Sequence, residues 1–320
     1  MKILVTGGAG FIGSQVAEGY LAEGHKVAIL DNLSSGKKEN LPHSAQFFKG
    51  DIRDRERVFE VFKEFQPEVL NHHAAQIDVR KSVENPVFDA EINILGLLNL
   101  LEACVRFETK RVVYVSSGGA IYGVPQYLPT DEEHPKQPLS PYGIAKYTGE
   151  LYLHFYAEVK GLKYITLRYS NVYGPRQDPA GEAGVVAIFS HLMLKGEAPK
   201  IFGDGNQTRD YVFVEDVVLA NLLALKHFDN QAFNIATGKA TSVNELFSLL
   251  GKLCHFFGKP VYLPERPGEL KESVLDIKKA KKLLSWQPKF SLEEGLRKTL
   301  LWLKALRANP LLSKRLNSNF

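Results

Sequence analysis

The chain has 320 residues, of which 44% are hydrophobic and 24% are charged. These proportions are ordinary for a folded globular protein, and they exclude a disordered chain, a collagen-like repeat and a disulfide-stapled scaffold. A chain of this length is expected to fold as one large or two modest domains. Its 40 Lys and Arg against 36 Asp and Glu give a formal charge of +4.

The positive charge is concentrated near one end of the sequence. Residues 261–320 contain 13 Lys and Arg against 6 Asp and Glu, a balance of +7, which leaves −3 for residues 1–260. The basic runs at 278–282 and 307–315 are typical of a solvated helix surface. We therefore expect no nucleic-acid partner.

Cysteine usage and hydropathy indicate the compartment. Two cysteines, Cys104 and Cys254, cannot form a disulfide framework and are typical of a reducing environment. No run approaches the roughly 20 apolar residues of a membrane span. The apolar start at 3–5 is too short for a signal peptide. We expect a cytoplasmic protein with no membrane partner.

The first half of the chain alternates strand-like and helix-like segments. Strands are predicted at 2–6, 26–30, 45–49, 68–71, 110–116 and 163–169, and helices at 11–23, 54–65, 88–107 and 141–160. Repeated β-α-β units predict an α/β fold, a doubly wound parallel Rossmann sheet with helices on both faces.

After Tyr169 the pattern loosens. Helices are predicted near 185–195, 214–227, 242–257 and 292–303, separated by short strands and turns. Ser291, with Glu294 three residues later, predicts a capping box at the start of the last helix. We predict a Rossmann domain over 1–169 and a smaller α/β substrate-binding domain over 170–320, with segments near 211–237 returning to the first domain.

A glycine-rich loop lies between the first strand and the first helix. Gly8, Gly10 and Gly13 fit the pattern GxGxxG, and Gly7 replaces Gly8 in the variant GxxGxxG. Glycines permit a tight turn and a close approach of a pyrophosphate, which the helix N-terminus attracts. Asp31 ends the second strand, 18 residues after Gly13. A carboxylate at this position accepts hydrogen bonds from the ribose hydroxyls and repels a 2′-phosphate. The pattern predicts NAD rather than NADP.

Tyr142 and Lys146 open the helix that follows the fifth strand. Residues four apart share a helix face, so the ammonium lies one turn from the phenol. A nearby cation favours the phenolate, and the positive charge of an oxidised nicotinamide would act in the same direction. Together they can lower the pKa of Tyr142 by about 3 units in a partly desolvated site. Ser116 and Ser117 end the preceding strand at the sheet edge where such folds bind ligands, so a hydroxyl there could hold the reacting oxygen.

These residues together resemble the extended short-chain dehydrogenase/reductase family, and within it the nucleotide-sugar 4-epimerases. The resemblance covers nearly the whole chain through motifs in a fixed order, which are the segments 31–36, 50–52, 73–76, 93–96, 116–123, 168–175, 203–205, 209–211 and 266–268.

The resemblance implies NAD as cofactor, a UDP-sugar as substrate, and a homodimer. It implies catalytic roles for Tyr142, Lys146 and Ser117. Cofactor contacts are implied for Gly7, Gly10, Phe11, Ile12, Gly13, Asp31, Asn32, Ser35, Gly36, Asp51, Ile52, Ala74, Ala75, Gln76 and Asn93, besides Tyr142 and Lys146. Substrate contacts are implied for Asn171, Phe202, Arg209 and Arg266, of which each Arg can offer a fork to a diphosphate. No metal site is expected, because the pair His72-His73 has no third ligand at zinc spacing.

The sequence departs from the family at Gly118, where many 4-epimerases carry the assisting Ser or Thr. Ser117 is our first choice for the missing hydroxyl, Ser116 the second, and a water beside Gly118 the third. The residues after Ser117 also lack the acidic pair of the family's dehydratases and the Glu of its decarboxylases.

The resemblance implies NAD-dependent inversion at C4 through a transient 4-keto sugar, with UDP-glucose and UDP-galactose as the first choice. Ser273 falls where relatives carry a gate residue beside the sugar, and its small size favours the N-acetylated pair as the alternative, ahead of the glucuronate pair. A net nucleotide-sugar dehydrogenase and a non-catalytic NAD-binding protein remain further alternatives. A dimer face is expected from Leu95, Leu98, Leu101, Val105, Leu151 and Phe155, unless these side chains pack on the sheet.

Overall fold

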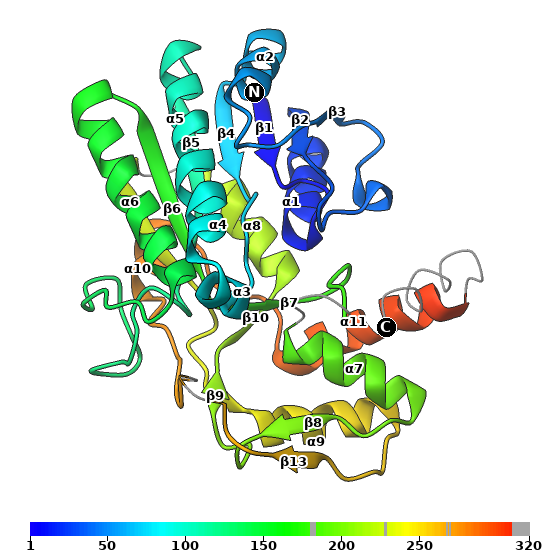
Figure 1. Cartoon of the computed structure of the whole chain (residues 1–320). Helices are drawn as coiled ribbons and strands as arrows, with labels where there is room; N and C mark the ends of the chain where they lie inside the picture. The colour runs from blue at the N-terminus through cyan, green and yellow to red at the C-terminus, as the bar shows by residue number, and fades with distance from the viewer. Residues whose placement is uncertain (180–183, 227–228, 267, 269, 309–320) are drawn as a thin grey trace.

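Short apolar runs form the centre of the molecule, because strands buried on both faces of a sheet need continuous hydrophobic side chains. The computed structural model describes residues 1–179, 184–226, 229–266, 268 and 270–308 (Figure 1). The strands are β1 (Lys2–Thr6), β2 (Lys26–Asp31), β3 (Gln46–Lys49), β4 (Val69–His72), β5 (Arg111–Ser117), β6 (Lys163–Tyr169) and β11 (Gln231–Ile235).

These seven strands form one parallel sheet in the order β11-β6-β5-β4-β1-β2-β3. From β1 the chain moves outward to β2 and β3, then returns to β4 and continues the other way to β5 and β6. The direction reverses between β1 and β4, and a crevice opens at such a point at the carboxyl ends of the strands. The predicted parallel Rossmann sheet is confirmed, with β11 as an additional strand.

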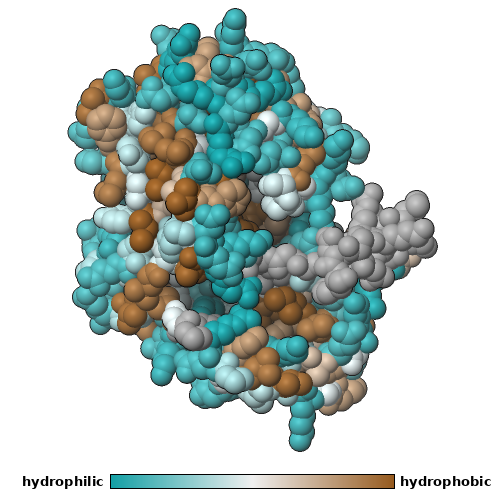
Figure 2. Space-filling model, in the orientation of Figure 1, coloured by the Kyte–Doolittle hydropathy of each residue, from teal (hydrophilic) through white to brown (hydrophobic). Residues whose placement is uncertain are grey.

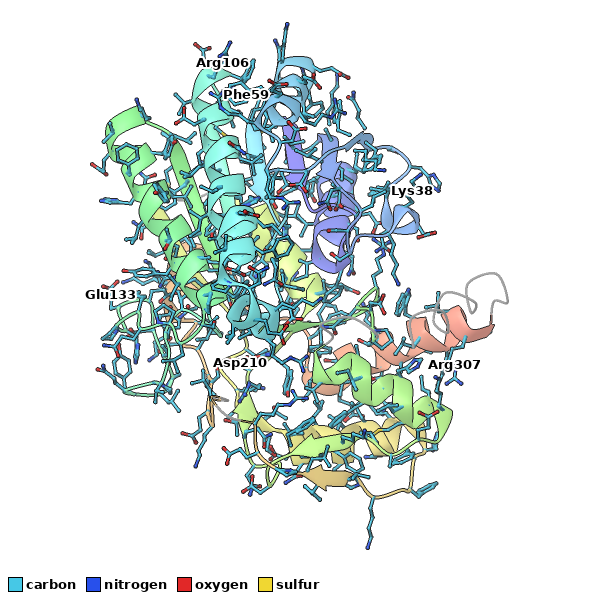
Figure 3. All side chains as sticks on the ribbon, in the orientation of Figure 1. Lys38, Phe59, Arg106, Glu133, Asp210 and Arg307 are labelled. Atoms are coloured by element: carbon cyan, nitrogen blue, oxygen red, sulfur yellow. The ribbon has the colours of Figure 1, made fainter. Side chains whose placement is uncertain are left out.

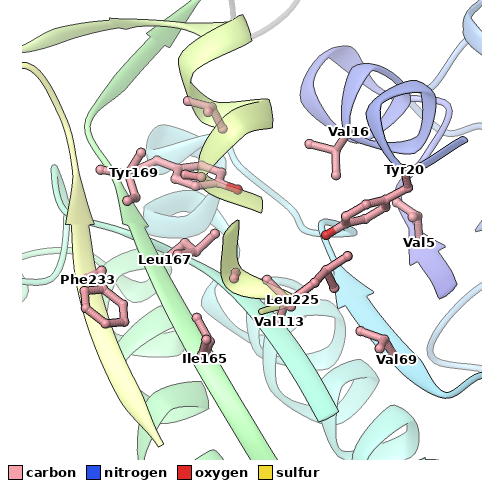
Figure 4. Packing of buried hydrophobic residues seen from close by; sticks show 14 of the residues in the cluster. Val5, Val16, Tyr20, Val69, Val113, Ile165, Leu167, Tyr169, Leu225 and Phe233 are labelled. Carbon is pink, nitrogen blue, oxygen red and sulfur yellow. The ribbon is translucent and has the colours of Figure 1, made fainter. Parts of the chain in front are cut away.

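Helices cover both faces of the sheet (Figure 1). One face carries α1 (Phe11–Ala22) and α8 (Val214–Ala224), and the other carries α2 (Arg55–Phe65), α5 (Gly96–Arg106) and α6 (Pro141–Lys160). Figure 4 shows the first core, a cluster that joins Val16 and Tyr20 of α1 with side chains from β1, β4, β5, β6 and β11. α2 begins after Asp54, whose carboxylate caps the helix by accepting from the backbone N–H of Arg57.

The helix predicted at 88–107 is interrupted. It begins within α4 (Pro86–Ala90), continues through a π-helical turn η2 (Glu91–Leu95) and ends with α5. A further short helix, α3 (Val79–Glu84), precedes α4. A shorter 3₁₀ turn, η1 (Lys38–Asn40), follows β2. The helix predicted at 214–227 ends at Ala224; residue 227, and the basic run 307–315 from residue 309 onward, lie outside the described residues.

The rest of the chain forms a third core at the carboxyl edge of the sheet (Figure 1). Its helices are α7 (Val185–Lys195), α9 (Val243–Cys254) and α11 (Leu292–Ala308), with α10 (Lys278–Leu283) packed against β11. Its strands pair two by two: β7 (Asn171–Tyr173) with β10 (Tyr211–Phe213), β9 (Thr208–Arg209) with β12 (Thr241–Ser242), and β8 (Lys200–Phe202) with β13 (Val261–Leu263).

The capping box expected before α11 is present, since the side chain of Glu294 accepts hydrogen bonds from both the backbone N–H and the hydroxyl of Ser291. The chain passes from β10 through α8 to β11, so it leaves the third core and re-enters the main sheet. The domain boundary near residue 170 stays a prediction. Among the helices of the described ranges, none combines the length and apolarity that crossing a membrane requires.

Candidate functional site

The loop between β1 and α1 is shaped by glycines. Gly7 has a φ of 68°, and a Cβ there would lie 2.6 Å from the backbone nitrogen of Ala74. A Cβ on Gly13 would overlap with the carbonyl of Gly7. Gly10 caps α1 without a side-chain bond, which leaves the helix N-terminus available to an anion. Phe11 and Ile12 follow in the first turn, half-buried.

Asp31 lies at the carboxyl end of β2 and is held by the loop that it faces. Its Oδ2 accepts from the backbone N–H of Ala9 at 3.0 Å, and its Oδ1 accepts from Leu33 at 2.8 Å. A Cβ on Gly36 would lie 3.0 Å from both oxygens, so this approach also requires glycine. A fixed carboxylate beside a glycine cradle fits the ribose and pyrophosphate of NAD and disfavours a 2′-phosphate.

Neighbouring residues form the next part of the crevice. Exposed Asn32 donates to Asp51 at 2.9 Å, and Arg53 also donates to Asp51. The hydrogen bond from Arg53 is the main reason that the pKa of Asp51 falls to about 2. Ile52 is buried, whereas Ser35 is exposed in the turn after β2.

The segment after β4 is fixed by a carboxylate that the sequence did not single out. Ala74 and Ala75 follow β4, half-buried. The side-chain amide of Asn93 forms two hydrogen bonds with the backbone of Gln76, one accepted from its N–H and one donated to its carbonyl. The side-chain amides of Gln76 and Asn93 also both donate to Oδ1 of buried Asp89, at 2.9 and 3.0 Å. Burial raises the pKa of Asp89. Its place four residues before Asn93, on the same helical face, was the available signal.

Tyr142 and Lys146 lie where α6 meets the end of β5. Ser140 caps α6 and Pro141 occupies its first turn, so Tyr142 enters the helix beside the crevice. Lys146 is buried; its Nζ donates to the carbonyl of Val115 at 3.0 Å and lies 5.9 Å from the centre of the Tyr142 ring. The hydroxyl of Ser117 forms a hydrogen bond with the Tyr142 phenol.

In the protein without cofactor, the pKa of Tyr142 is raised rather than lowered. Burial, only partly offset by the hydrogen bond from Ser117, raises the pKa of Tyr142 to about 12. Burial also lowers the pKa of Lys146 to about 8, while the charge of Asp89 opposes this shift. Desolvation of both groups therefore outweighs the attraction between ammonium and phenolate that the spacing suggested.

The structure separates the two candidate hydroxyls and accounts for Gly118. Ser116 donates to Glu150 at 2.6 Å inside the protein, whereas Ser117 reaches Tyr142. A Cβ on Gly118 would overlap with Cδ1 of buried Leu275. Position 118 therefore cannot carry Ser or Thr unless Leu275 moves.

A hollow opens beside the end of β5. The hollow is shallow, and its empty space of about 220 Å³ includes open solvent. Its lining residues are Gly118, Gly119, Tyr122, Gly123, Pro125, Thr130, Leu270, Glu272, Ser273 and Leu275. Asp210, labelled in Figure 3, helps to fix this wall because its carboxylate accepts from the backbone of Thr237, Gly238 and Leu275. Ser273 thus lies next to the strand end that carries Ser117.

The expected substrate residues lie on the side of the third core. Phe202 ends β8, and the guanidinium of exposed Arg266 stacks on its ring, with its carbon 3.5 Å from the ring centre. Arg209 is half-buried on β9 and donates to the carbonyl of Thr208. Asn171 is exposed at the start of β7. The structure brings Arg266 to Phe202, while Arg209 and Asn171 occupy separate strands.

Over the residues with described positions, no group of three or more His, Cys, Asp or Glu side chains is placed to hold an ion. His72 accepts from or donates to the Thr6 hydroxyl at 2.7 Å, and burial lowers the pKa of His72 and of His73. Both rings therefore pack as neutral groups at the end of β4.

The chain is similar to known proteins over nearly all of its length. Residues 3–236 match the model of the NAD dependent epimerase/dehydratase family. A putative UDP-glucose 4-epimerase of Methanocaldococcus jannaschii is 52% identical over 94% of this chain and 98% of its own length. The solved UDP-glucose 4-epimerase of Thermotoga maritima with UDP-glucose has a TM-score of 0.94 at 52% identity, covering 95% of this chain and 99% of that one. The Thermus thermophilus enzyme with NAD gives 0.91 at 46%, with the same coverage of both chains.

Proposed function

The chain belongs to the NAD dependent epimerase/dehydratase family, and we propose that it inverts C4 of a UDP-hexose, with UDP-glucose and UDP-galactose as its substrates. The assignment rests on one observation. Tyr142 is hydrogen-bonded to Ser117 and lies beside Lys146 at the carboxyl edge of β5, next to a hollow. Relatives about half identical in sequence, described as UDP-glucose 4-epimerases, support it.

NAD is the cofactor of this family, and when bound it supplies a reversible oxidation of C4. The glycines of the loop at 7–13 and Asp31 would hold it, together with Asn32, Ser35, Gly36, Asp51 and Ile52 on the adenosine side. Ala74, Ala75, Gln76 and Asn93 would face it beyond β4. Asp89 would fix the orientation of the Gln76 and Asn93 amides.

Tyr142 performs the proton transfer in this proposal. As phenolate it takes the proton of the sugar 4-hydroxyl while C4 is oxidised to a ketone, and it returns the proton when C4 is reduced from the opposite face. The hydroxyl of Ser117 donates to the sugar O4 and keeps it beside the phenol. The ammonium of Lys146 stabilises the phenolate, which burial alone disfavours.

Inversion requires that the sugar present both faces to the same Tyr142, so the ketone must turn over inside the site. We propose the hollow beside Gly118 as the place of this movement, because three glycines leave part of its wall without side chains. Ser273 lies in the same wall, and its side chain is small. The N-acetylated pair is therefore the second candidate substrate.

The nucleotide part of the substrate extends toward the third core. Arg209 and Arg266 are proposed to bind the diphosphate, since guanidinium groups form paired hydrogen bonds to phosphate oxygens. Phe202 is proposed to pack on the uracil ring, with Arg266 stacked on its other face. Asn171 is proposed to donate to the sugar nucleotide from the start of β7.

We also propose a cytoplasmic homodimer acting in carbohydrate metabolism. Brown apolar side chains gather in Figure 2 on the side of the molecule that carries α5 and α6. Leu95, Val105, Leu151 and Phe155 are exposed there. Leu101, expected on this face, is instead fully buried against the sheet, and Leu98 is half-buried.

A panel of UDP-sugars tests the function. Purified protein is expected to interconvert UDP-glucose and UDP-galactose without a net change in the reduced cofactor. Faster conversion of the N-acetylated pair would favour the second candidate. Reduced cofactor accumulating in step with product would contradict an epimerase and indicate a dehydrogenase.

A further inference from the structure

The end of β5 is joined to α6 by a continuous series of hydrogen bonds. Four consecutive residues of the strand each bond a residue of the helix. The Tyr114 hydroxyl donates to the Lys146 carbonyl at 3.2 Å, Lys146 Nζ to the Val115 carbonyl at 3.0 Å, the Ser116 hydroxyl to Glu150 Oε1 at 2.6 Å, and Ser117 pairs with the Tyr142 phenol.

Glu150 connects this series to a third element. Its Oε1 also accepts from Arg168 Nε at 3.0 Å, and its Oε2 accepts from Arg168 Nη2 at 2.6 Å. Both side chains are less than a tenth exposed. Since Tyr142, Lys146 and Glu150 are spaced by four, one face of α6 carries all three. The carboxylate therefore joins the catalytic face of α6 to the ends of both β5 and β6.

A buried ion pair of this kind is a poor source of net stability, because desolvation offsets most of the attraction. Its geometry, however, is fixed, since a bidentate pair has little freedom. Ser117 directly follows Ser116, so the position of the Ser116 hydroxyl sets where the next side chain meets Tyr142. We propose that Glu150 is a positioning residue, which through Ser116 holds Ser117 and Tyr142 at the distance that proton transfer requires.

Arg168 extends the same network to the wall of the hollow. Its Nη1 donates to the Tyr122 hydroxyl at 2.9 Å, and that hydroxyl donates to Asn234 Oδ1 at 2.7 Å. Tyr122 lines the hollow. The network therefore has two arms. One runs through Ser116 toward the Tyr142 phenol, and the other runs through Tyr122 toward the wall of the hollow, where we place the sugar. The first arm governs the rate of the chemical step, and the second governs affinity for the sugar.

This inference rests on the proposed epimerase function, and conservative variants of the two arms test it. Ser116→Ala and Tyr122→Phe each remove one hydroxyl from a buried site. Their matched controls are Thr109→Val, which removes a buried hydroxyl bonded to Pro67 next to the opposite end of β5, and Tyr20→Phe, which removes one bonded to Asn71.

Steady-state kinetics with UDP-glucose are measured for the four variants and the original protein, with melting temperatures alongside. Ser116→Ala is expected to lower kcat about tenfold or more at an unchanged KM, because small misplacements of reacting groups are costly. Tyr122→Phe is expected to raise KM severalfold at an unchanged kcat. The two controls are expected to leave both constants unchanged.

The outcomes separate this inference from the function on which it rests. An original protein that converts no UDP-sugar overturns the epimerase proposal. An active original protein with an unchanged kcat in Ser116→Ala overturns the positioning role. Equal losses in Ser116→Ala and Thr109→Val that follow the melting temperature overturn it as well. Glu150→Gln is expected to lower kcat more than Ser116→Ala does. Because this substitution leaves the buried Arg168 without its carboxylate and can reduce stability, its kcat is measured per folded molecule.

Discussion

Two parts of the proposed site differ in how strongly the protein itself holds them. Around Tyr142 the groups are buried and bonded to several elements, as Lys146 and Ser116 show. Around Phe202 the groups are half-buried or exposed, and Arg266 has an aromatic ring as its described partner. The residues around Tyr142, the chemical corner, are thus ordered in advance, as electrostatic catalysis requires. For the residues around Phe202, the nucleotide corner, we propose that binding of the ligand supplies the order.

This difference predicts that a change in the chemical corner acts on kcat. Tyr142→Phe is expected to lower kcat by roughly 10³–10⁴, because no other group in the proposal accepts the proton of the sugar hydroxyl. Turnover of UDP-glucose and the amount of bound NAD measure this. Tyr152→Phe, on the same helix, serves as the control. A residual rate near that of the control would show that another group is the base.

Ser117→Ala is expected to have the next largest effect, a loss of roughly 10²–10⁴ in turnover through the lost hydrogen bond to the sugar oxygen. The same assay measures it, and bound NAD should stay constant. Unchanged turnover would remove Ser117 from the mechanism and favour a water beside Gly118.

Lys146 should show a conflict between function and stability. Burial lowers the pKa of Lys146 from 10.5 to about 8, so at neutral pH the folded protein holds a charge that burial disfavours. Below pH 8 both the folded and the unfolded states carry this proton and the cost is complete; it fades as the folded protein loses the proton between pH 8 and 10.5.

Lys146→Met should therefore abolish most activity and yet raise the free energy of unfolding of the NAD-free protein at pH 7 by about 3 kcal/mol. Denaturant unfolding at pH 7 and pH 10 measures this, and the gain should shrink at the higher pH. The control is Lys298→Met, an ion-paired lysine that is nearly half exposed. A less stable Lys146→Met protein at pH 7 would contradict the sign.

A change in the nucleotide corner should act on KM instead. Arg266→Ala is expected to raise KM for UDP-glucose by about 10–100-fold at nearly constant kcat, the loss of a charged hydrogen bond worth about 1.5–3 kcal/mol. Lys271→Ala is the control for the loss of a nearby exposed charge. A fall in kcat with unchanged KM would break the division between the two corners.

Much of the nucleotide-binding half could be predicted from residues near one another in sequence. The glycine loop, Asp31 at the end of β2, and the face shared by Tyr142 and Lys146 all follow from local periodicity and turn chemistry. The number of strands in the sheet was harder to predict. β11 pairs with β6 from a segment about 60 residues away along the chain, and local sequence patterns do not indicate such pairing.

The details of the chemical corner depended on contacts across the fold. Ser116 is distinguished from Ser117 by its hydrogen bond to Glu150, a residue of another element. The lack of space for a side chain at Gly118 comes from Leu275, which is distant in sequence. In the protein without cofactor the pKa of Tyr142 is raised, because spacing reveals a neighbouring charge but not the loss of water. Asp89 was missed because its partners Gln76 and Asn93 were read only as cofactor contacts.

The sequence by itself determined the parallel sheet and the NAD cofactor, and it placed the glycine loop and the pair Tyr142 and Lys146 that we propose for phosphate binding and proton transfer. These depend on short-range rules: side-chain periodicity, glycine conformations and spacing along one helix. Tertiary structure decided which hydroxyl meets Tyr142, why position 118 is glycine and how strongly the two titrating groups are desolvated. Those properties arise from packing between distant segments, since burial and hydrogen-bond geometry are set by what the whole fold brings together.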